Sequence, residues 1–299
     1  MDYKEILSVA SRQIESLSGH TLDVLSINKP SDIEYAMFLG KVVSKVSPLI
    51  GNMIEFYSKN KLNELDWEGH GKWERQDPGF PDTIFNGDVE PKPGIEIKTW
   101  FPFATEITAR FKDSIAHFEH DQTNVAIIAW IPESLIYGKP KVIGVFVCSG
   151  LSLAIARDTH YHKPPYYLVF EPEDTSDRTS NLQQTNTNGY VFQGDKALLL
   201  KATEEMREWG EEWFSFNPSR EFSNKDKISR YQELIKTLLG KYPYRLDTNF
   251  AKMDRIAHDG LENFKTRVQS MDVDGHTVKE WARKIVTDEA SVRELLGLG

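Results

Sequence analysis

An acidic residue two positions before a lysine can present a carboxylate and an ammonium together, and this spacing occurs three times in the chain. The three pairs are Asp2/Lys4, Glu90/Lys92 and Glu96/Lys98. The first pair lies at a terminus, where chains fray, and the second has a proline between its members in a Pro-x-Pro turn. Only Glu96 and Lys98 lie in a strand-like sequence, so they are the pair that a rigid element can hold in place.

The surrounding sequence predicts how these side chains point. Residues 94–100 read GIEIKTW, and alternation along a strand puts Glu96 and Lys98 on one face with the isoleucines on the other. The preceding strand-like run, PDTIF, supplies a second carboxylate in Asp82. A hairpin with 86–94 as its connection is centred near residue 89, which places Asp82 opposite Glu96 with β-carbons roughly 5 Å apart.

Two carboxylates at this separation are suited to one hard divalent cation, because Mg²⁺ takes oxygen ligands and retains water. Such a site suits phosphodiester hydrolysis, in which metal ions polarise the phosphate, generate hydroxide and stabilise the leaving oxygen. Lys98 would orient or help to deprotonate the attacking water, and it would offset the repulsion between the carboxylates. We therefore expect Asp82, Glu96 and Lys98 to be catalytic, with Asp82 and Glu96 as Mg²⁺ ligands.

The motif Pro81-Asp82, a spacer and Glu96-Ile97-Lys98 resembles the PD-(D/E)XK signature of many type II restriction endonucleases. The resemblance implies an α/β core in which helices flank a central mixed β-sheet, and it implies the same roles for the three charged residues. It also implies another acidic metal ligand on a helix before the sheet, for which Glu55 is the candidate. The order of the elements extends the similarity over about half of the chain.

The first metal ligand has a competitor in Asp88. In GDVEPKPGIEIK, Asp88 has the shorter spacing to Glu96 that is found in relatives of methyl-directed mismatch-repair nickases. Asp82 is preferred because it begins a strand, whereas Asp88 follows Asn-Gly in a predicted turn. In a chain without this activity, Asp82 would instead cap a turn, and Glu96 and Lys98 would form the solvated face of an edge strand.

Helical spacing dominates the part before the motif, residues 1–66. Ser31 and Glu34 have the spacing of a capping box, which predicts a helix that Pro48 ends. Ser47 then has the position of an N-cap, with Pro48 in the first turn of the next helix. The sequence thus predicts two successive helices before the hairpin.

Short strand-like runs follow, separated by Gly, Pro and Asn, and 104–120 between them is compatible with a helix. The runs are PDTIF, GIEIKTWF, NVAIIAWI, KVIGVFVC and PYYLVF. Helical spacing returns after residue 196, and its last stretch opens with a capping-box pattern at Thr277 and Glu280. We therefore expect an α/β fold with an N-terminal helical part (1–66), a catalytic core (67–195) and a helical C-terminal region (196–299) packed on the core as one unit.

Two groups of polar residues are candidates for contact with DNA. The first follows the catalytic strand, where hydroxyls and cations could hold phosphates. The second lies in the polar loop 171–195, where Gln and Asn could read adenine and Arg could read guanine or phosphate. The predicted DNA contacts are Thr105, Thr108, Arg110, Lys112, Arg178, Gln183, Gln184, Asn186 and Asn188.

The composition is that of an ordinary folded domain, with 39% hydrophobic and 27% charged residues. A net charge of −9 argues against a protein that coats nucleic acid without specificity, but an acidic enzyme can still gather its cations in one cleft. No apolar run approaches the roughly 18 residues of a membrane span, and the N-terminal residues do not resemble a signal peptide. We expect a cytoplasmic protein.

The function expected from these features is that of a type II restriction endonuclease that uses Mg²⁺ to cleave double-stranded DNA at a short sequence. A homodimer is expected, because a two-fold protein matches a palindromic site and supplies one active site for each strand. Two alternatives stay open: a monomeric nicking or repair endonuclease of the same superfamily, and a non-catalytic DNA-binding protein that has only the fold.

Overall fold

The chain folds into two units. The computed structural model describes residues 1–77, 79–103, 106–107, 115, 118, 120–161, 164–170, 188–216, 224–247 and 253–297. Unit 1 comprises Met1–Ile107, His120–Gly150 and His258–Gly299, and unit 2 comprises Thr108–Glu119 and Leu151–Ala257. The chain therefore leaves the first unit twice and returns to it twice, the second time at His258.

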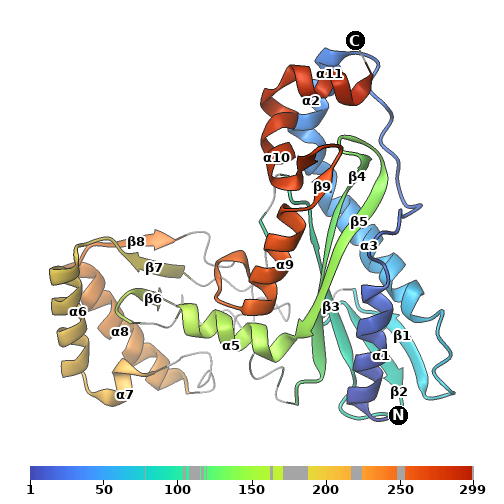
Figure 1. The fold of residues 1–299 in the computed structure, drawn as a ribbon. Helices are drawn as coiled ribbons and strands as arrows, with labels where there is room; N and C mark the ends of the chain where they lie inside the picture. Colours follow the sequence, from blue (N-terminus) through green and yellow to red (C-terminus); the bar gives the residue numbers. More distant parts are fainter. Residues whose placement is uncertain are drawn as a thin grey trace. The chain divides into compact units, whose positions relative to one another are not determined.

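A five-stranded mixed sheet forms the centre of unit 1 (Figure 1). Its strands, in sheet order, are β1 (Gly71–Arg75), β2 (Thr83–Gly87), β3 (Gly94–Trp100), β4 (Thr123–Ser134) and β5 (Tyr137–Ser149). The β3–β4 pair is parallel, whereas the other three pairs are antiparallel. This confirms the mixed sheet, and the four sequence runs predicted as strands in this part all form strands.

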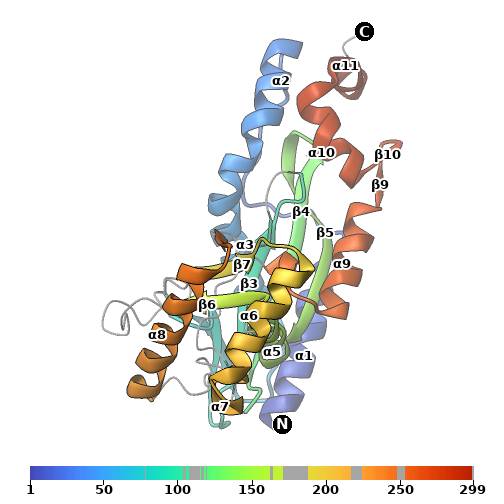
Figure 2. The ribbon, with the colours of Figure 1, turned by 90° about the vertical axis from the view of Figure 1, so that its left-hand side faces the viewer.

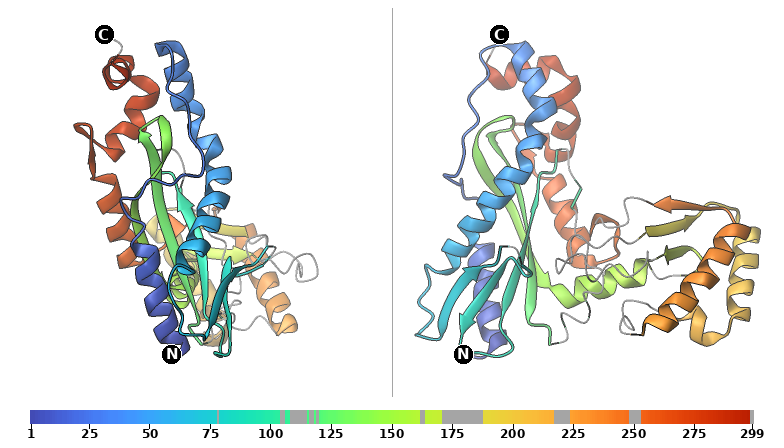
Figure 3. Two further views of the ribbon diagram at one scale, coloured as in Figure 1. Left: turned by 90° about the vertical axis from the view of Figure 1, so that its right-hand side faces the viewer. Right: turned by 180° about the vertical axis from the view of Figure 1, so that it is seen from behind.

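Helices cover the sheet on both sides. Those of unit 1 are α1 (Tyr3–Glu15), α2 (Ile33–Val42), the 3₁₀ turn η1 (Val43–Val46), α3 (Ser47–Leu62), α9 (Asp259–Gln269), α10 (Val278–Thr287) and α11 (Glu289–Leu296). Helix α3 packs on β1 and β3, and α9 packs on β5. Figures 2 and 3 show α3 and α9 on opposite sides of the sheet. Helix α2 packs against α10 and α11, and the short hairpin of β9 (Asp272–Val273) and β10 (His276–Thr277) joins α9 to α10.

The caps of the N-terminal helices differ from those predicted. Asp32, rather than Ser31, caps α2: its backbone is extended and its carboxylate accepts from the Tyr35 N–H at 2.8 Å, while the Ser31 hydroxyl donates to Asp32. Ser47 is not an N-cap, because η1 continues directly from α2 into α3 and leaves no free helix end. The predicted capping box of Thr277 and Glu280 is confirmed at the start of α10.

Unit 2 contains a three-stranded antiparallel sheet of order β6–β7–β8 and several helices. Its elements are α5 (Gly150–Tyr161), β6 (Tyr167–Phe170), β7 (Asn188–Phe192), α6 (Lys196–Glu208), α7 (Glu211–Phe214), α8 (Lys225–Lys241), β8 (Tyr244–Asp247) and the 3₁₀ turn η3 (Met253–Arg255). The core of the unit gathers Leu168, Met206, Phe216, Tyr231, Ile235 and Leu238.

The unit boundaries differ from the segments expected from the sequence. The expected C-terminal region 196–299 is divided, because 196–257 lies in unit 2 and 258–299 returns to the sheet of unit 1. It also contains strands, since β8 pairs with β7 across more than fifty residues of sequence. Local periodicity does not reveal such distant pairing.

No helix in the described ranges is both long enough and apolar enough to cross a membrane.

Candidate active site

The hairpin of β2 and β3 has the register that the sequence predicted. Thr83 pairs with Ile95 and Ile84 pairs with Gly94, so the two strands are symmetric about residue 89. Continuing this register by one residue places Asp82 opposite Glu96. Glu96 is buried as fully as Ile95 and Ile97, and the hydrogen bond between the Lys98 ammonium and Glu96 shows that these two side chains lie on the same face of β3.

Three hydrogen bonds hold Asp82 against β3 and the end of β1. Its amide N–H donates to Glu96 Oε2 at 3.0 Å, and its Oδ2 accepts from the amide N–H of Ile97 at 2.7 Å. Its carbonyl oxygen accepts from the Gln76 N–H at 2.8 Å, which ties Asp82 to the end of β1. One hydrogen bond therefore holds the carboxylate itself, and the other two hold the backbone of Asp82.

Lys98 completes a charged cluster with the two carboxylates. Its ammonium forms a hydrogen-bonded ion pair with Glu96 Oε1 and lies 3.8 Å from Asp82 Oδ2. The structure thus brings Asp82, Glu96 and Lys98 together, and we call them the charged triad. Their side chains are 16%, 0% and 12% exposed, so one ammonium compensates two carboxylates that have little access to bulk water.

Burial and mutual repulsion perturb the protonation of the triad. Loss of hydration raises the pKa of Asp82 to about 7, with a further increase from the charges of Glu96 and Glu55 and an opposing effect of Lys98. Burial disfavours the ammonium of Lys98, but the carboxylates of Glu96 and Asp82 outweigh that effect and raise its pKa above the ordinary value. Lys98 is therefore a cation in the metal-free protein, and the triad carries an excess of negative charge once Asp82 is ionised above about pH 7.

Two glycines allow the elements around the triad to approach one another. A β-carbon on Gly51 of α3 would lie 2.8 Å from Thr99 Oγ1 of β3, closer than real contacts allow. A β-carbon on Gly94 would collide with the ring of Pro81, beside Asp82. Glycine at these positions therefore lets α3 pack closely on β3 and lets the Pro81 ring pack against the start of β3.

Glu55 lies one helical turn after Gly51, and the residue that forms an ion pair with it was not indicated by the sequence. Arg75, the last residue of β1, lies 3.5 Å from Glu55 and 3.0 Å from Asp77. Burial raises the pKa of Glu55; the charges of Lys98 and Arg75 oppose this and that of Glu96 adds to it. Glu55 is thus within electrostatic range of the triad while its carboxylate is paired with Arg75.

Arg75 was missed because β1 was not predicted as a strand. Its sequence, GKWER, holds one apolar residue among charged ones, which is a weak strand signal. Its side of the sheet is nevertheless well packed: Trp73 and Phe85 meet edge to face at 5.5 Å between ring centroids, and Trp67 contacts both. Paired tryptophans on either side of a glycine turn are the signal that could have identified β1.

Asp88, the competing ligand, lies away from the triad in the connection between β2 and β3. Its side chain is 80% exposed, and its carboxylate lies 3.8 Å from His70 Nδ1. Of the two candidates, Asp82 is therefore the one whose carboxylate meets Lys98 and whose backbone meets Glu96.

The donor set fits a cation that keeps part of its hydration shell. Within the described part of the chain, no group of three or more His, Cys, Asp or Glu side chains is arranged to hold a metal ion, so Glu55 does not complete a three-carboxylate site. Mg²⁺ does not need one, because it is usually held by one or two carboxylates together with water and substrate phosphate. Asp82 and Glu96 provide two adjacent carboxylates whose negative charge Lys98 compensates only in part.

The predicted DNA contacts cannot be placed beside the triad. The structure does not describe Thr105, Thr108, Arg110, Lys112, Arg178, Gln183, Gln184 and Asn186. For Asn188 it describes the backbone, which begins β7 in unit 2 opposite Phe170. These assignments stay predictions from the sequence.

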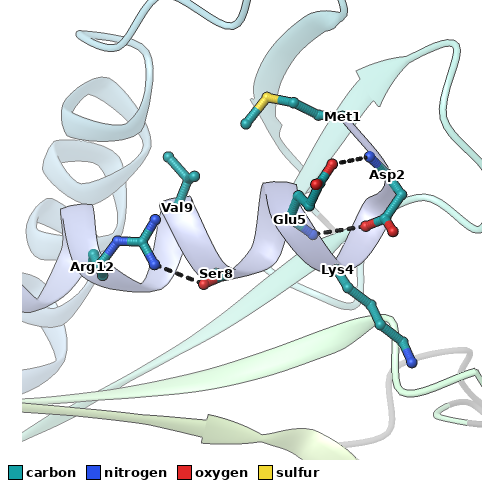
Figure 4. A pocket seen from close by; sticks show the side chains of 7 residues that line it. All are labelled: Met1, Asp2, Lys4, Glu5, Ser8, Val9 and Arg12. Atoms are coloured by element: carbon teal, nitrogen blue, oxygen red, sulfur yellow. Dashed lines mark hydrogen bonds between the residues drawn. The ribbon is translucent and has the colours of Figure 1, made fainter.

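A surface hollow elsewhere in unit 1 does not offer comparable chemistry. It has a volume of about 460 Å³ and is lined by Met1, Asp2, Lys4, Glu5, Ser8, Val9 and Arg12 of the α1 region (Figure 4). Asp2 and Glu5 are used in the capping box of α1, and Arg12 donates to Ser8 at 2.8 Å. The lining polar groups serve the helix itself and include no member of the charged triad.

Comparison with known proteins adds no family assignment. No protein-family model matches the chain, and no match is found among curated proteins. The function is therefore inferred from the geometry of the site and from the motif.

Proposed function

We propose that this protein is a Mg²⁺-dependent endonuclease of the PD-(D/E)XK type that cleaves double-stranded DNA at a short specific sequence, as type II restriction enzymes do. The observation that carries the proposal is the buried charged triad, in which Asp82 and Glu96 lie at opposing positions of one hairpin and Lys98 lies against both. The mixed sheet with helices on both faces supports it, because that is the kind of core the motif implies.

In the proposed reaction each member of the triad has a distinct task. Asp82 and Glu96 would hold Mg²⁺, which supplies the Lewis acidity that phosphodiester hydrolysis needs. The hydrogen bonds that Asp82 accepts from the N–H groups of Ile97 and Gln76 keep it in place while a phosphate enters. Lys98, whose pKa is raised by the carboxylates, would orient the attacking water and stabilise negative charge on the phosphate as an ammonium.

Of the two alternatives, the non-catalytic DNA-binding protein is the less favoured. Removing three charges from water costs free energy that mutual attraction recovers only in part. A protein that only binds DNA gains nothing from burying Glu96 at 0% exposure beside Asp82 and Lys98. A monomeric nicking or repair endonuclease would use the same triad, so the products of the reaction must distinguish it from a restriction enzyme.

A digest of long unmethylated DNA in the presence of Mg²⁺ tests the proposal. A sequence-specific double-strand endonuclease gives discrete fragments, and it gives none when the Mg²⁺ is chelated. A nickase instead converts supercoiled plasmid to the relaxed circle. DNA that is retarded in a gel but stays uncut with Mg²⁺ or Mn²⁺ would identify a binding protein and would contradict the proposal.

The raised pKa of Asp82 predicts that Mg²⁺ binding depends on pH. With a pKa of about 7 in the metal-free protein, the carboxyl is protonated at lower pH and must lose that proton before it binds a cation. Affinity for Mg²⁺ should therefore rise about tenfold for each pH unit up to pH 7 and level off above it. Calorimetric titrations with Mg²⁺ from pH 5.5 to 8.5 measure this affinity. Asp82→Asn should bind Mg²⁺ more weakly, and its affinity should no longer rise with pH in this range.

A further inference from the structure

Four large apolar side chains are exposed along one side of the N-terminal helices. Tyr35, Phe38, Leu49 and Phe56 are 48%, 56%, 50% and 54% exposed, and we call them the α2–α3 stripe. They lie on α2 and α3, which η1 joins without a break in helical structure from Ile33 to Leu62. Figures 2 and 3 show the two helices following one another on one side of the sheet of unit 1.

Helical spacing gathers these side chains on one side. Tyr35 and Phe38 are three residues apart and their rings stack with centroids 6.3 Å apart, while Leu49 and Phe56 are separated by two turns. The other sides of the same helices are already covered, because α2 meets α10 at Gly40 and α3 packs on the sheet at Gly51, beside Thr99 of β3. Single exposed apolar residues are common, but an aligned set on one element indicates an interaction surface.

We propose that the α2–α3 stripe is the contact between two copies of this chain, arranged antiparallel about a two-fold axis. The charges at its ends are complementary in that arrangement. Glu34 flanks Tyr35 in the first turn of α2, and the ammonium of Lys59 lies 5.0 Å from the ring centroid of Phe56 near the end of α3. An antiparallel pair brings Glu34 to the partner's Lys59, and the symmetry repeats this contact at the other end.

The apolar residues match in the same arrangement. Residues near one end of the stripe in one copy face those near the other end in its partner, so the aromatic pair of α2 meets Phe56 of the partner. A parallel arrangement would instead place Glu34 opposite the partner's Glu34 and Lys59 opposite the partner's Lys59, and like charges repel. The order of charges and rings therefore favours the antiparallel dimer.

The size of the surface predicts a dimer of modest affinity. Thirty helical residues extend about 45 Å, and a contact about 10 Å wide along them buries roughly 450 Å² per copy, below the roughly 800 Å² of a standard interface. We expect dissociation in the micromolar range, with further contacts made when both copies bind one DNA.

If the proposed function holds, the position of the stripe places the dimer contact on the same helix that lies next to the charged triad. Helix α3 presents Leu49 and Phe56 to the partner, while its Gly51 and Glu55 face β3 and Arg75. One helix thus connects the interface to the vicinity of the triad, and the two-fold axis relates the two sites as the strands of a palindromic DNA are related.

Sedimentation velocity over a micromolar concentration series tests the interface without reference to activity. The wild-type chain should pass from monomer to dimer, and Phe38→Glu and Phe56→Glu should weaken the dimer by at least about tenfold, since each places two charges in the contact. Leu200→Glu is the matched control, because Leu200 is 54% exposed on α6 outside the stripe. Unchanged melting temperatures establish that the variants fold.

Charge reversal tests the antiparallel order. Glu34→Lys and Lys59→Glu should each weaken the dimer, and the double variant should restore it because the pair is re-formed with opposite signs. A wild-type chain that stays monomeric throughout the series, or a Leu200→Glu variant that weakens the dimer as much as Phe38→Glu does, overturns the proposal. A dimer that cleaves no DNA leaves the interface standing and contradicts only the proposed function.

Discussion

Lys98→Met is expected to reduce the rate of DNA cleavage by roughly 10²- to 10⁴-fold, the range that a positioned catalytic group contributes. Methionine keeps most of the aliphatic volume but removes the ammonium that lies against Glu96 and Asp82. The two carboxylates stay in place, so Mg²⁺ binding should persist while turnover is lost. Single-turnover cleavage rates, measured together with Mg²⁺ titrations, separate these two effects.

The chain contains a matched control for this variant. Lys92 follows Glu90 with the same spacing, but it lies exposed in the connection between β2 and β3. Lys92→Met should therefore cleave within about twofold of wild type, as expected for a surface substitution away from the site. If Lys98→Met cleaved as fast as Lys92→Met, the catalytic role of Lys98 would be wrong.

Asp82→Asn is expected to reduce cleavage by at least about 100-fold, because it removes one of the two proposed ligands of the metal ion on which catalysis depends. Asparagine preserves the shape and can still accept from the Ile97 N–H. Asp88→Asn should leave the rate close to that of wild type, because Asp88 is 80% exposed and lies beside His70. Cleavage rates of the two variants measured side by side decide between the two candidate ligands.

The same substitution should have the opposite effect on stability. The folded-state pKa of Asp82 is raised from 3.8 to about 7, so the metal-free fold loses stability as the pH rises between these two values, and the full loss is present above pH 7. Asp82→Asn should then be more stable than wild type at pH 8 by on the order of 1–3 kcal/mol, measured by urea unfolding with a chelator present. A loss of both activity and stability would indicate that Asp82 is structural instead.

The hairpin and its charged face could be predicted from the sequence because both depend on local patterns. Alternation in GIEIKTW fixed which side chains share a face, and the turn between β2 and β3 fixed the register that brings Asp82 to Glu96. The strands β4 and β5 were equally clear, since continuous apolar runs are typical of strands buried on both faces.

Features that depend on distant residues could not be predicted in this way. The pairing of β7 with β8 and the return of α9 to the first sheet join segments far apart in the sequence. Arg75 reaches Glu55 only because β1 and α3 lie together. The cap of α2 shows a smaller limit: Ser31 and Asp32 are both good capping residues, and backbone geometry at Asp32 decides between them.

The most direct test of the central claim is the Mg²⁺-dependent cleavage rate of Glu96→Gln compared with wild type. Glu96 is the fully buried member of the triad, hydrogen-bonded to Lys98 and to the Asp82 amide, and glutamine replaces it with nearly the same shape. If this triad is the nuclease site, the variant remains folded and cleaves DNA at least about 100-fold more slowly. Equal rates for a folded Glu96→Gln and for wild type would contradict the claim.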